Sequence, residues 1–313
     1  MALMEHSSTK EDARGEELML FPQAVADPVA AFSGRLAEIE FPLTIGATTV
    51  EVVESSAILT RPTGFMAGFD YTLNPYMGCQ FGCSYCYAAF FAQSKELQDD
   101  WGSWVKVKAN AIQKISRMRS DLEGKTIYMS SVTDPYQPNE RRLELVRGIL
   151  EILIPKRPIL IVQTRSGLVT RDIDLYQQMG DSARVNITVT TDSEDVRRAF
   201  EPECPTISKR LETAAKLREA GIRTMITMSP LLPVSDPEQF AERLLETGVE
   251  SFVVQPFHPE RGRYVRGTRS GAIEITSAMG WNSERYEETV DVLRLRLPDL
   301  RDGQAGFAPC LKD

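Results

Sequence analysis

The chain has 313 residues, 42% of them hydrophobic, and a formal net charge of −8 with an isoelectric point near 5.1. This length and composition suffice for one large globular core, and no run of about 18 apolar residues could span a membrane. The acidic balance argues against a surface that wraps nucleic acid non-specifically, although it does not exclude a local basic groove. The two histidines are too few for multi-histidine metal chemistry.

The cysteines and the first residues bear on the compartment. Five cysteines, an odd number with three of them in one loop, do not predict a disulfide framework. The start of the chain, MALMEHSSTKEDARGEE, has no apolar run behind a basic segment, so no secretory signal is predicted. Thiolates also need a reducing compartment to stay available as ligands. We therefore predict a cytoplasmic protein without membrane segments.

In chain order, residues 1 to about 20 are polar, and we expect them to be disordered or loosely attached. They precede a predicted helix at 28–40 and a predicted strand at 48–54. Beyond them, short β-branched runs alternate with helical patterns, which is typical of a parallel sheet covered by helices. About six such units favour an α/β fold with a partial (β/α)6 barrel over a closed eight-fold one. We expect an N-terminal extension, 1–56, followed by one catalytic domain, 57–313. Further helices are predicted at 88–96, 110–120, 139–154, 172–179, 208–220, 237–246 and 281–295, and strands at 125–131, 159–164, 185–191, 224–229 and 251–255.

The stretch from Asn74 to Tyr87, NPYMGCQFGCSYCY, carries the densest chemical signal. It places Cys79, Cys83 and Cys86 in a C-x3-C-x2-C array, so three thiolates can turn toward one point. A closed zinc site takes four ligands, usually from two separated pairs. Three thiolates instead suit an iron–sulfur cube that leaves one iron open. A zinc loop completed by a distant ligand and three unligated thiols are the alternatives.

Parallel-strand folds place their chemistry at the carboxyl ends of the strands, so polar residues there are candidates for a binding site. Ser130, Ser131 and Asp134 lie at the end of the predicted strand 125–131 and could receive an ammonium group or ribose hydroxyls. Ordinary turn formation is the alternative for them. Arg165 follows the next strand and could pair with a carboxylate, or it could be a solvated loop residue.

The following strand end offers weaker signals. Thr188 and Thr190 lie near the end of the strand predicted at 185–191, where β-branched propensity alone also explains them. Glu201 and Arg210 form either an ion-pair brace or part of the site. The sequence does not distinguish these roles.

The cysteine spacing, with Tyr85 directly before the last cysteine, resembles the radical S-adenosylmethionine (SAM) superfamily. Residues from about Ala57 to Asp236 resemble the subfamily that includes spore photoproduct lyase, often described as DNA-repair-photolyase-like. The matching segments are TGFMAGFDYTLNPYMGCQFGCSYCYA, SSVTDPYQPNE, ITVTTDSEDVRRAFEP and AGIRTMITMSPLLP.

The resemblance implies a cofactor pair and a reaction. Cys79, Cys83 and Cys86 would each ligate one iron of a 4Fe–4S cluster, and SAM would chelate the fourth iron through its amino and carboxylate groups. Reductive cleavage of SAM would give a 5′-deoxyadenosyl radical, with electrons from a donor such as flavodoxin or ferredoxin. The residues expected around SAM are Tyr85 and Tyr87 at the adenosyl group, Ser130, Ser131 and Arg165 at the methionyl end, Thr188 or Thr190 near the ribose or carboxylate, and Asp134.

The chain also departs from spore photoproduct lyase. In that enzyme a cysteine that donates a hydrogen atom lies on the strand before the serines, whereas here the strand from Thr126 to Met129 has none. Arg165 also stands where the lyase uses a lysine. We therefore predict a relative of unknown substrate rather than the lyase itself. Of the two remaining cysteines, Cys204 is expected to be a buried inert thiol, while Cys310 could be a redox thiol.

The basic segment from His258 to Gly271, HPERGRYVRGTRSG, follows the last predicted strand and so would lie at the same end as the cysteines. Arginine forks suit phosphates and an aromatic ring can stack on a base, so we predict a nucleic-acid contact here, with a solvated loop as the alternative. The residues concerned are Arg261, Arg263, Tyr264, Arg266 and Arg269.

Two functions from different classes remain open at this point. The first is a radical SAM enzyme acting on a nucleic-acid base or another macromolecule. The second is a non-catalytic sensor or binding protein that uses an iron–sulfur or other metal loop without turnover.

Overall fold

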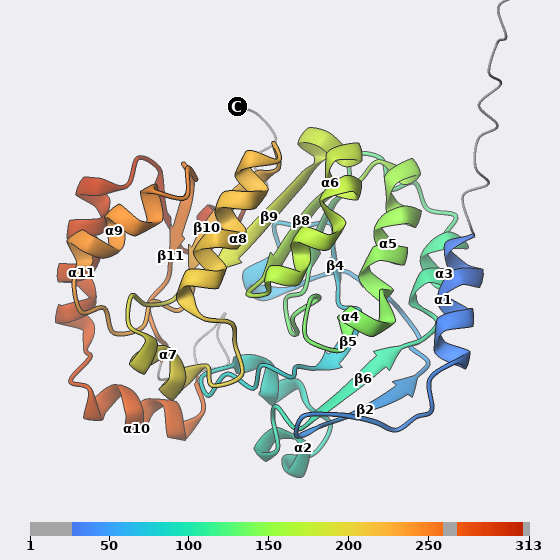
Figure 1. Cartoon of the computed structure of the whole chain (residues 1–313), viewed down its shortest axis with the longest axis horizontal. Coiled ribbons are helices and arrows are strands. Elements are labelled where there is room, and N and C mark those ends of the chain that lie inside the picture. Colours follow the sequence, from blue (N-terminus) through green and yellow to red (C-terminus); the bar gives the residue numbers. More distant parts are fainter. Residues whose placement is uncertain (1–26, 259–267, 309–313) are drawn as a thin grey trace, which may run out of the picture.

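The computed structural model describes residues 27–258 and 268–308, and an eight-stranded sheet lies at its centre (Figure 1). The strand order is β12-β11-β10-β9-β8-β7-β4-β3, and every neighbouring pair is parallel except β3 with β4. Among the described residues the edge strands β3 and β12 do not pair with each other, so the sheet is open, as the predicted partial barrel requires. The strands are β3 (Leu59–Thr60), β4 (Tyr71–Leu73), β7 (Thr126–Met129), β8 (Ile159–Thr164), β9 (Ala183–Thr188), β10 (Arg223–Met228), β11 (Phe252–Val254) and β12 (Leu300–Asp302).

A second, four-stranded sheet in the order β1-β2-β6-β5 joins the N-terminal part of the chain to the cysteine region. Its strands are β1 (Leu43–Ile45), β2 (Thr48–Val53), β5 (Tyr76–Gly78) and β6 (Trp104–Lys108). Strand β6 pairs in parallel with β2 and antiparallel with β5. Because β5 ends directly before Cys79, this sheet fixes the start of the cysteine loop.

Helices cover one face of the central sheet, with α5, α6 and α8 in front of it in Figure 1. The helices are α1 (Pro28–Ala37), α2 (Lys95–Asp99), α3 (Ala111–Ser116), α4 (Glu140–Leu143), α5 (Leu145–Leu153), α6 (Ile173–Met179), α7 (Glu194–Phe200), α8 (Ile207–Glu219), α9 (Pro237–Leu245), α10 (Ser270–Ala278), α11 (Ser283–Arg296) and α12 (Gly303–Phe307). The 3₁₀ turns are η1 (Gly64–Met66), η2 (Tyr87–Phe91), η3 (Ile154–Lys156), η4 (Gly167–Asp172) and η5 (Gly180–Ser182). None of the helices in the described ranges is long and apolar enough to cross a bilayer.

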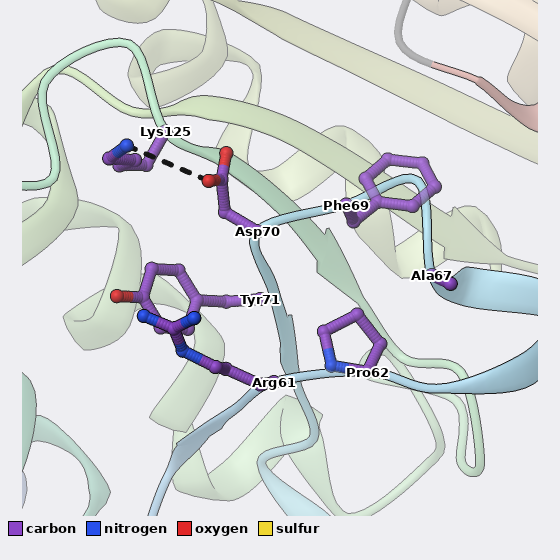
Figure 2. Close-up of a pocket in the computed structure, with 7 residues that line it drawn as sticks. All are labelled: Arg61, Pro62, Ala67, Phe69, Asp70, Tyr71 and Lys125. Atoms are coloured by element: carbon purple, nitrogen blue, oxygen red, sulfur yellow. Dashed lines mark ion pairs between the residues drawn. The ribbon is translucent and has the colours of Figure 1, made fainter.

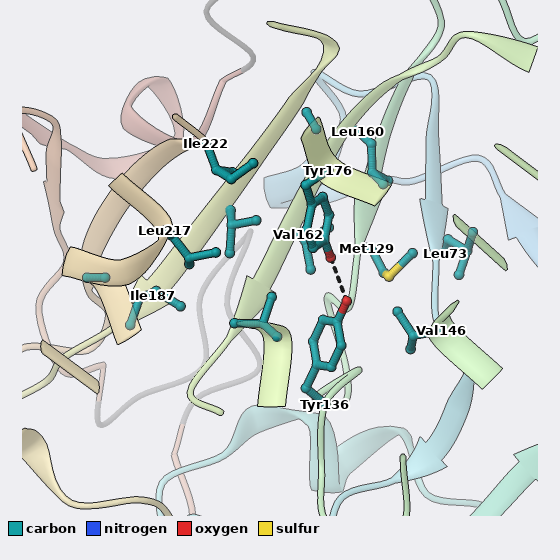
Figure 3. Packing of buried hydrophobic residues seen from close by; sticks show 14 of the residues in the cluster. Leu73, Met129, Tyr136, Val146, Leu160, Val162, Tyr176, Ile187, Leu217 and Ile222 are labelled. Atoms are coloured by element: carbon teal, nitrogen blue, oxygen red, sulfur yellow. Dashed lines mark hydrogen bonds between the residues drawn. The ribbon is translucent and has the colours of Figure 1, made fainter. Parts of the chain in front are cut away.

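Alternation along the strands separates two kinds of core. Leu160 and Val162 of β8 point into the apolar layer beneath the helices, where they pack beside the hydrogen-bonded pair Tyr136 and Tyr176 (Figure 3). Ile161, between them, belongs to a separate apolar cluster on the other face of the sheet. The side chains of that cluster are Phe69, Tyr128, Ile161, Met225, Val253 and Phe307.

Several predicted boundaries were wrong. The helix predicted at 139–154 is divided at Glu144, whose φ is +51°, because the carboxylate of Glu140 accepts hydrogen bonds from the N–H groups of Leu145 and Val146 and so caps a new helix. The helix predicted at 88–96 is instead the turn η2 followed by α2. Extended backbone at Ala92 ends the first, and the Ser94 side chain caps the second.

Two strands end two or three residues earlier than predicted, and other elements were not predicted. Strand β7 stops at Met129 because Ser130 takes a φ of +76°, and β9 stops at Thr188. The elements not predicted include β6, α10, β12 and α12. The segment at 1–20, which we expected to be loosely attached, lies outside the described residues.

Candidate active site at the carboxyl ends of the strands

The cysteine loop is held against the segment that follows β7. Thr133 donates a hydrogen bond to the carbonyl of Gly78 (2.6 Å), and the Gln80 N–H donates to the side chain of Gln137 (2.8 Å). At Gly78, which has a φ of +76°, a Cβ would lie 2.4 Å from the carbonyl oxygen of Trp104. Only glycine fits this conformation at this separation. The loop therefore occupies the carboxyl edge of the parallel sheet, as predicted.

The thiols of the array are close enough to influence one another. Burial, with charges on Asp134 and the other thiols, raises the pKa of Cys79 well above its ordinary value. Burial and the charge of Cys83 raise the pKa of Cys86 to about 11. A hydrogen bond with Cys204 and the charge of Arg165 instead lower the pKa of Cys83, against the effect of burial. A metal that binds thiols of raised pKa must therefore displace their protons.

Within the described ranges, no three His, Cys, Asp or Glu side chains converge as ready ligands of a single metal ion. A cubane distributes its thiolate ligands over separate iron atoms, so they need not converge on one point. Two guanidinium groups, that of the fully buried Arg210 and that of the partly buried Arg165, supply positive charge beside Cys83. This donor set and its charge balance fit an anionic cluster.

A buried charge network adjoins the loop. Glu201, which is fully buried, forms ion pairs with Arg210 and Arg165. It also accepts hydrogen bonds from the hydroxyls of Tyr85 and Thr190. Arg165 in turn donates to the Tyr85 hydroxyl (2.9 Å). Burial acts to raise the pKa of Glu201, but the charges of Arg210 and Arg165 outweigh it and lower the pKa to about 2. The pair Glu201–Arg210 is therefore a brace. It contacts four of the predicted site residues, namely Tyr85, Arg165, Thr190 and, through its carbonyl, Thr188.

The predicted residues after β7 differ in what they do. The Asp134 carboxylate accepts hydrogen bonds from the Thr164 hydroxyl (2.7 Å) and from the N–H groups of Arg165 and Tyr136 (2.9 Å each), so it joins the ends of β7 and β8. Burial raises its pKa despite these bonds. Ser130, by contrast, has a buried hydroxyl with no hydrogen-bond partner in the described part of the chain, and its φ is +76°. A buried, unpaired hydroxyl in a strained backbone is a frequent feature of binding sites.

Thr188 belongs to a polar layer on the inner face of the sheet that the sequence analysis did not identify. Gln163 donates to the hydroxyls of Thr188 (2.5 Å) and Thr227 (2.7 Å) and accepts from Tyr128 (2.9 Å) and Asn186 (3.1 Å). In the sequence, the signal for this layer is the presence of polar residues at inward positions of β7 to β10, with two of them, Asn186 and Thr188, on β9. This layer lies between the apolar cluster around Phe307 and the site.

The remaining predicted residues lie at the outer side of the loop. The Tyr87 ring is 40% exposed, and its hydroxyl donates to the carbonyl of Ser131. Arg269 donates to the carbonyl of Asp99 (3.1 Å), and its charge acts on the Cys86 thiol. The other residues predicted to contact nucleic acid, which lie between 259 and 267, are outside the described residues, as is Cys310.

A cavity of about 290 Å³ lies at the opposite end of the strands, around Arg61, Tyr71 and the ion pair of Asp70 with Lys125 (3.6 Å), and is shown in Figure 2. Its walls come from the amino ends of β4 and β7. It is separate from the cysteine loop, so we do not include it in the candidate site.

Comparison with known proteins agrees with this geometry. The Radical SAM superfamily model matches residues 73–246. An uncharacterized protein of Methanocaldococcus jannaschii is 39% identical over 184 residues, covering 59% of this chain and 69% of that protein. An uncharacterized protein of Acidianus two-tailed virus is 30% identical over 239 residues, or 71% and 75% of the two chains.

Solved structures show the same fold. Spore photoproduct lyase in complex with a dinucleoside spore photoproduct aligns with a TM-score of 0.58 at 14% identity, covering 90% of this chain and 96% of the lyase. A lyase mutant with bound AdoMet and the same photoproduct gives a TM-score of 0.59. Radical SAM proteins are enzymes that use a 4Fe–4S cluster and SAM. Because the family model covers more than half of the chain, the protein belongs to the radical SAM superfamily.

Proposed function

We propose that Cys79, Cys83 and Cys86 each ligate one iron of the 4Fe–4S cluster, and that the protein binds SAM between this loop and the ends of β7 to β9. The proposal is carried by the three thiols on a loop fixed at the carboxyl edge, beside the unpaired Ser130 hydroxyl and the Arg165–Glu201 pair. When bound, the cluster and SAM supply reductive carbon–sulfur cleavage and a 5′-deoxyadenosyl radical.

The chain's own residues have binding and shielding roles in this proposal. Arg165, with 17% of its side chain exposed, retains a face that can meet the SAM carboxylate while Glu201 and Tyr85 hold its position. Ser130 offers its hydroxyl to the methionyl end. Tyr85 and Tyr87 flank the adenosyl group, and Thr190 orients Glu201. The apolar cluster around the loop, which includes Phe81 and Phe200, excludes water from a site that must protect a radical.

The test is anaerobic reconstitution with iron and sulfide, followed by SAM and dithionite. We expect a brown chromophore and release of 5′-deoxyadenosine. Cys83→Ala should remove both, because three protein ligands leave no substitute. Cys310→Ala, which removes a cysteine outside the array, is the matched control and should keep chromophore and cleavage. A fully loaded, active Cys83→Ala variant would disprove the ligand assignment.

For the substrate we propose a nucleic-acid base. The support is the arginine-rich segment from His258 to Gly271 together with the position of Arg269, whose charge reaches Cys86. Spore photoproduct lyase, which shares the fold, has been solved with a dinucleoside photoproduct. Replacing Arg263 and Arg266 together should weaken binding of DNA or RNA and reduce its log–log salt slope by roughly 0.7–0.9 per lost phosphate contact.

SAM cleavage without substrate should stay near wild type in that double variant. Unchanged nucleic-acid affinity at low salt would discard the arginine site. No measurable affinity in the wild type would instead indicate a small-molecule or protein substrate. We further propose a flavodoxin or ferredoxin as electron donor, a cytoplasmic location, and the division into residues 1–56 and 57–313. SAM cleavage without dithionite, driven by purified flavodoxin or ferredoxin, tests the proposed electron donor.

A further inference from the structure

A fourth cysteine lies against the array although it comes from a distant part of the chain. The sulfur atoms of Cys83 and Cys204 are 3.6 Å apart, although the two residues are 121 positions apart in the sequence. Both side chains are buried. The N–H of Ser84 also donates to the carbonyl of Phe200 (2.8 Å), so the segment that ends α7 docks directly on the cysteine loop.

The backbone around Cys204 is fixed by two arginines. Arg197 donates to the carbonyls of Glu201 (3.0 Å), Pro202 (3.2 Å) and Cys204 (3.2 Å). Arg210 donates to the carbonyl of Pro205 (2.9 Å). A connection of this kind between two helices would otherwise be free to move. The backbone that carries Cys204 is therefore held by contacts other than the contact between the two sulfurs.

We propose that Cys204 is a positioning residue whose S–H donates a hydrogen bond to the sulfur of Cys83 and thereby raises the reduction potential of the cluster. The inference rests on the proposed role of Cys83 as a ligand. A ligating cysteine is a thiolate, which only accepts hydrogen bonds, so between the two sulfurs Cys204 is the donor. Hydrogen bonds to cluster sulfurs tune the potential, because they stabilise the more negative, reduced state.

The alternative is that Cys204 is itself an iron ligand. A fourth cysteine on the cluster would occupy the iron that SAM needs, so the two roles predict different results when the thiol is removed. A donor can be removed with the cluster retained. Loss of a ligand should instead reduce cluster loading.

The test uses reconstituted full-length protein and compares Cys204→Ala with Cys204→Ser. The midpoint potential is measured by anaerobic redox titration, followed by the EPR signal of the reduced cluster. We expect Cys204→Ala to load fully and to shift the midpoint to a more negative potential. Cys204→Ser, which keeps a donor, should stay near wild type. Ser84→Ala is the matched control, because the buried Ser84 hydroxyl has no partner in the described part of the chain.

Equal midpoints in wild type and Cys204→Ala, with the cluster loaded in both, would overturn the inference and leave the proposed function intact. Loss of the cluster in Cys204→Ala would also overturn it, in favour of a ligand. A wild-type protein that takes up no cluster would refute the proposed function and this inference together.

Discussion

Replacing Glu201 with glutamine tests the buried charge network that braces the site. In the folded protein the charges of Arg210 and Arg165 overcome the effect of burial and lower the pKa of Glu201 to about 2, from an ordinary value of 4.5. A carboxyl group whose pKa is lower in the folded than in the unfolded protein contributes its full stabilisation at pH values above the unfolded pKa. That stabilisation is lost as the pH falls toward the folded value. The relevant window therefore runs from about pH 4.5 down to about pH 2.

The size of the effect follows from two independent arguments. A difference of somewhat more than two pKa units, at ~1.4 kcal/mol each, corresponds to a loss on the order of 3 kcal/mol across the window. Removing one partner of a buried ion pair costs about 3–5 kcal/mol, because the other charge is left uncompensated. Both members of the pair Glu201–Arg210 are fully buried, so solvent screening does not reduce this figure.

The assay is urea unfolding of cluster-free wild type and Glu201→Gln at neutral pH and at steps down to about pH 2. We expect the variant to be less stable by about 3 kcal/mol at pH 7. The gap between the two proteins should narrow below pH 4.5. Other carboxylates titrate equally in both proteins and cancel in the difference. Glu212→Gln, an exposed carboxylate between Lys209 and Lys216, is the control and should change little. A constant gap between wild type and Glu201→Gln at every pH would refute the reasoning.

Two further predictions concern the loop and the reaction. Gly78→Ala should destabilise the fold and reduce cluster loading, because its Cβ would lie 2.4 Å from the carbonyl oxygen of Trp104. The control is Gly124→Ala, which has a similar φ of +66° but open space around it and should show only the smaller backbone strain. Thermal melting and the iron content of both variants measure the difference. The protein should not convert spore photoproduct into two thymines even while it cleaves SAM, because β7 runs from Thr126 to Met129 without a cysteine. Chromatography of the treated dinucleotide would show any conversion into the dinucleotide with two unlinked thymine bases.

The fold was predictable where local pattern and tertiary structure agree. Strand β8 occupies exactly the predicted residues, and α8 ends before Gly221, which takes a φ of +78° as a helix stop signal requires. Strand β6 was not predicted, although its sequence WVKVK alternates apolar and polar residues in step with its burial. What the sequence does not show is that β6 pairs with β2 and β5, which lie earlier in the chain. The break at Glu144 depends likewise on a buried carboxylate, which no helix propensity reveals.

The same difference between local pattern and long-range contact decides which residues of the candidate site could be predicted. The spacing of Cys79, Cys83 and Cys86 encodes a loop, and a loop is local, so three ligands could be identified from sequence. The contact of Cys204 with Cys83 is not local. It depends on the docking of the segment after α7 on that loop, and an isolated cysteine 121 positions from the array carries no periodic signal. The same docking places Glu201, which directly follows α7, beside Tyr85 and Arg165. Its pairing with Arg210 is a structural brace, yet the carboxylate also positions Arg165, so the stability of the brace and the geometry of the proposed SAM site depend on one buried group.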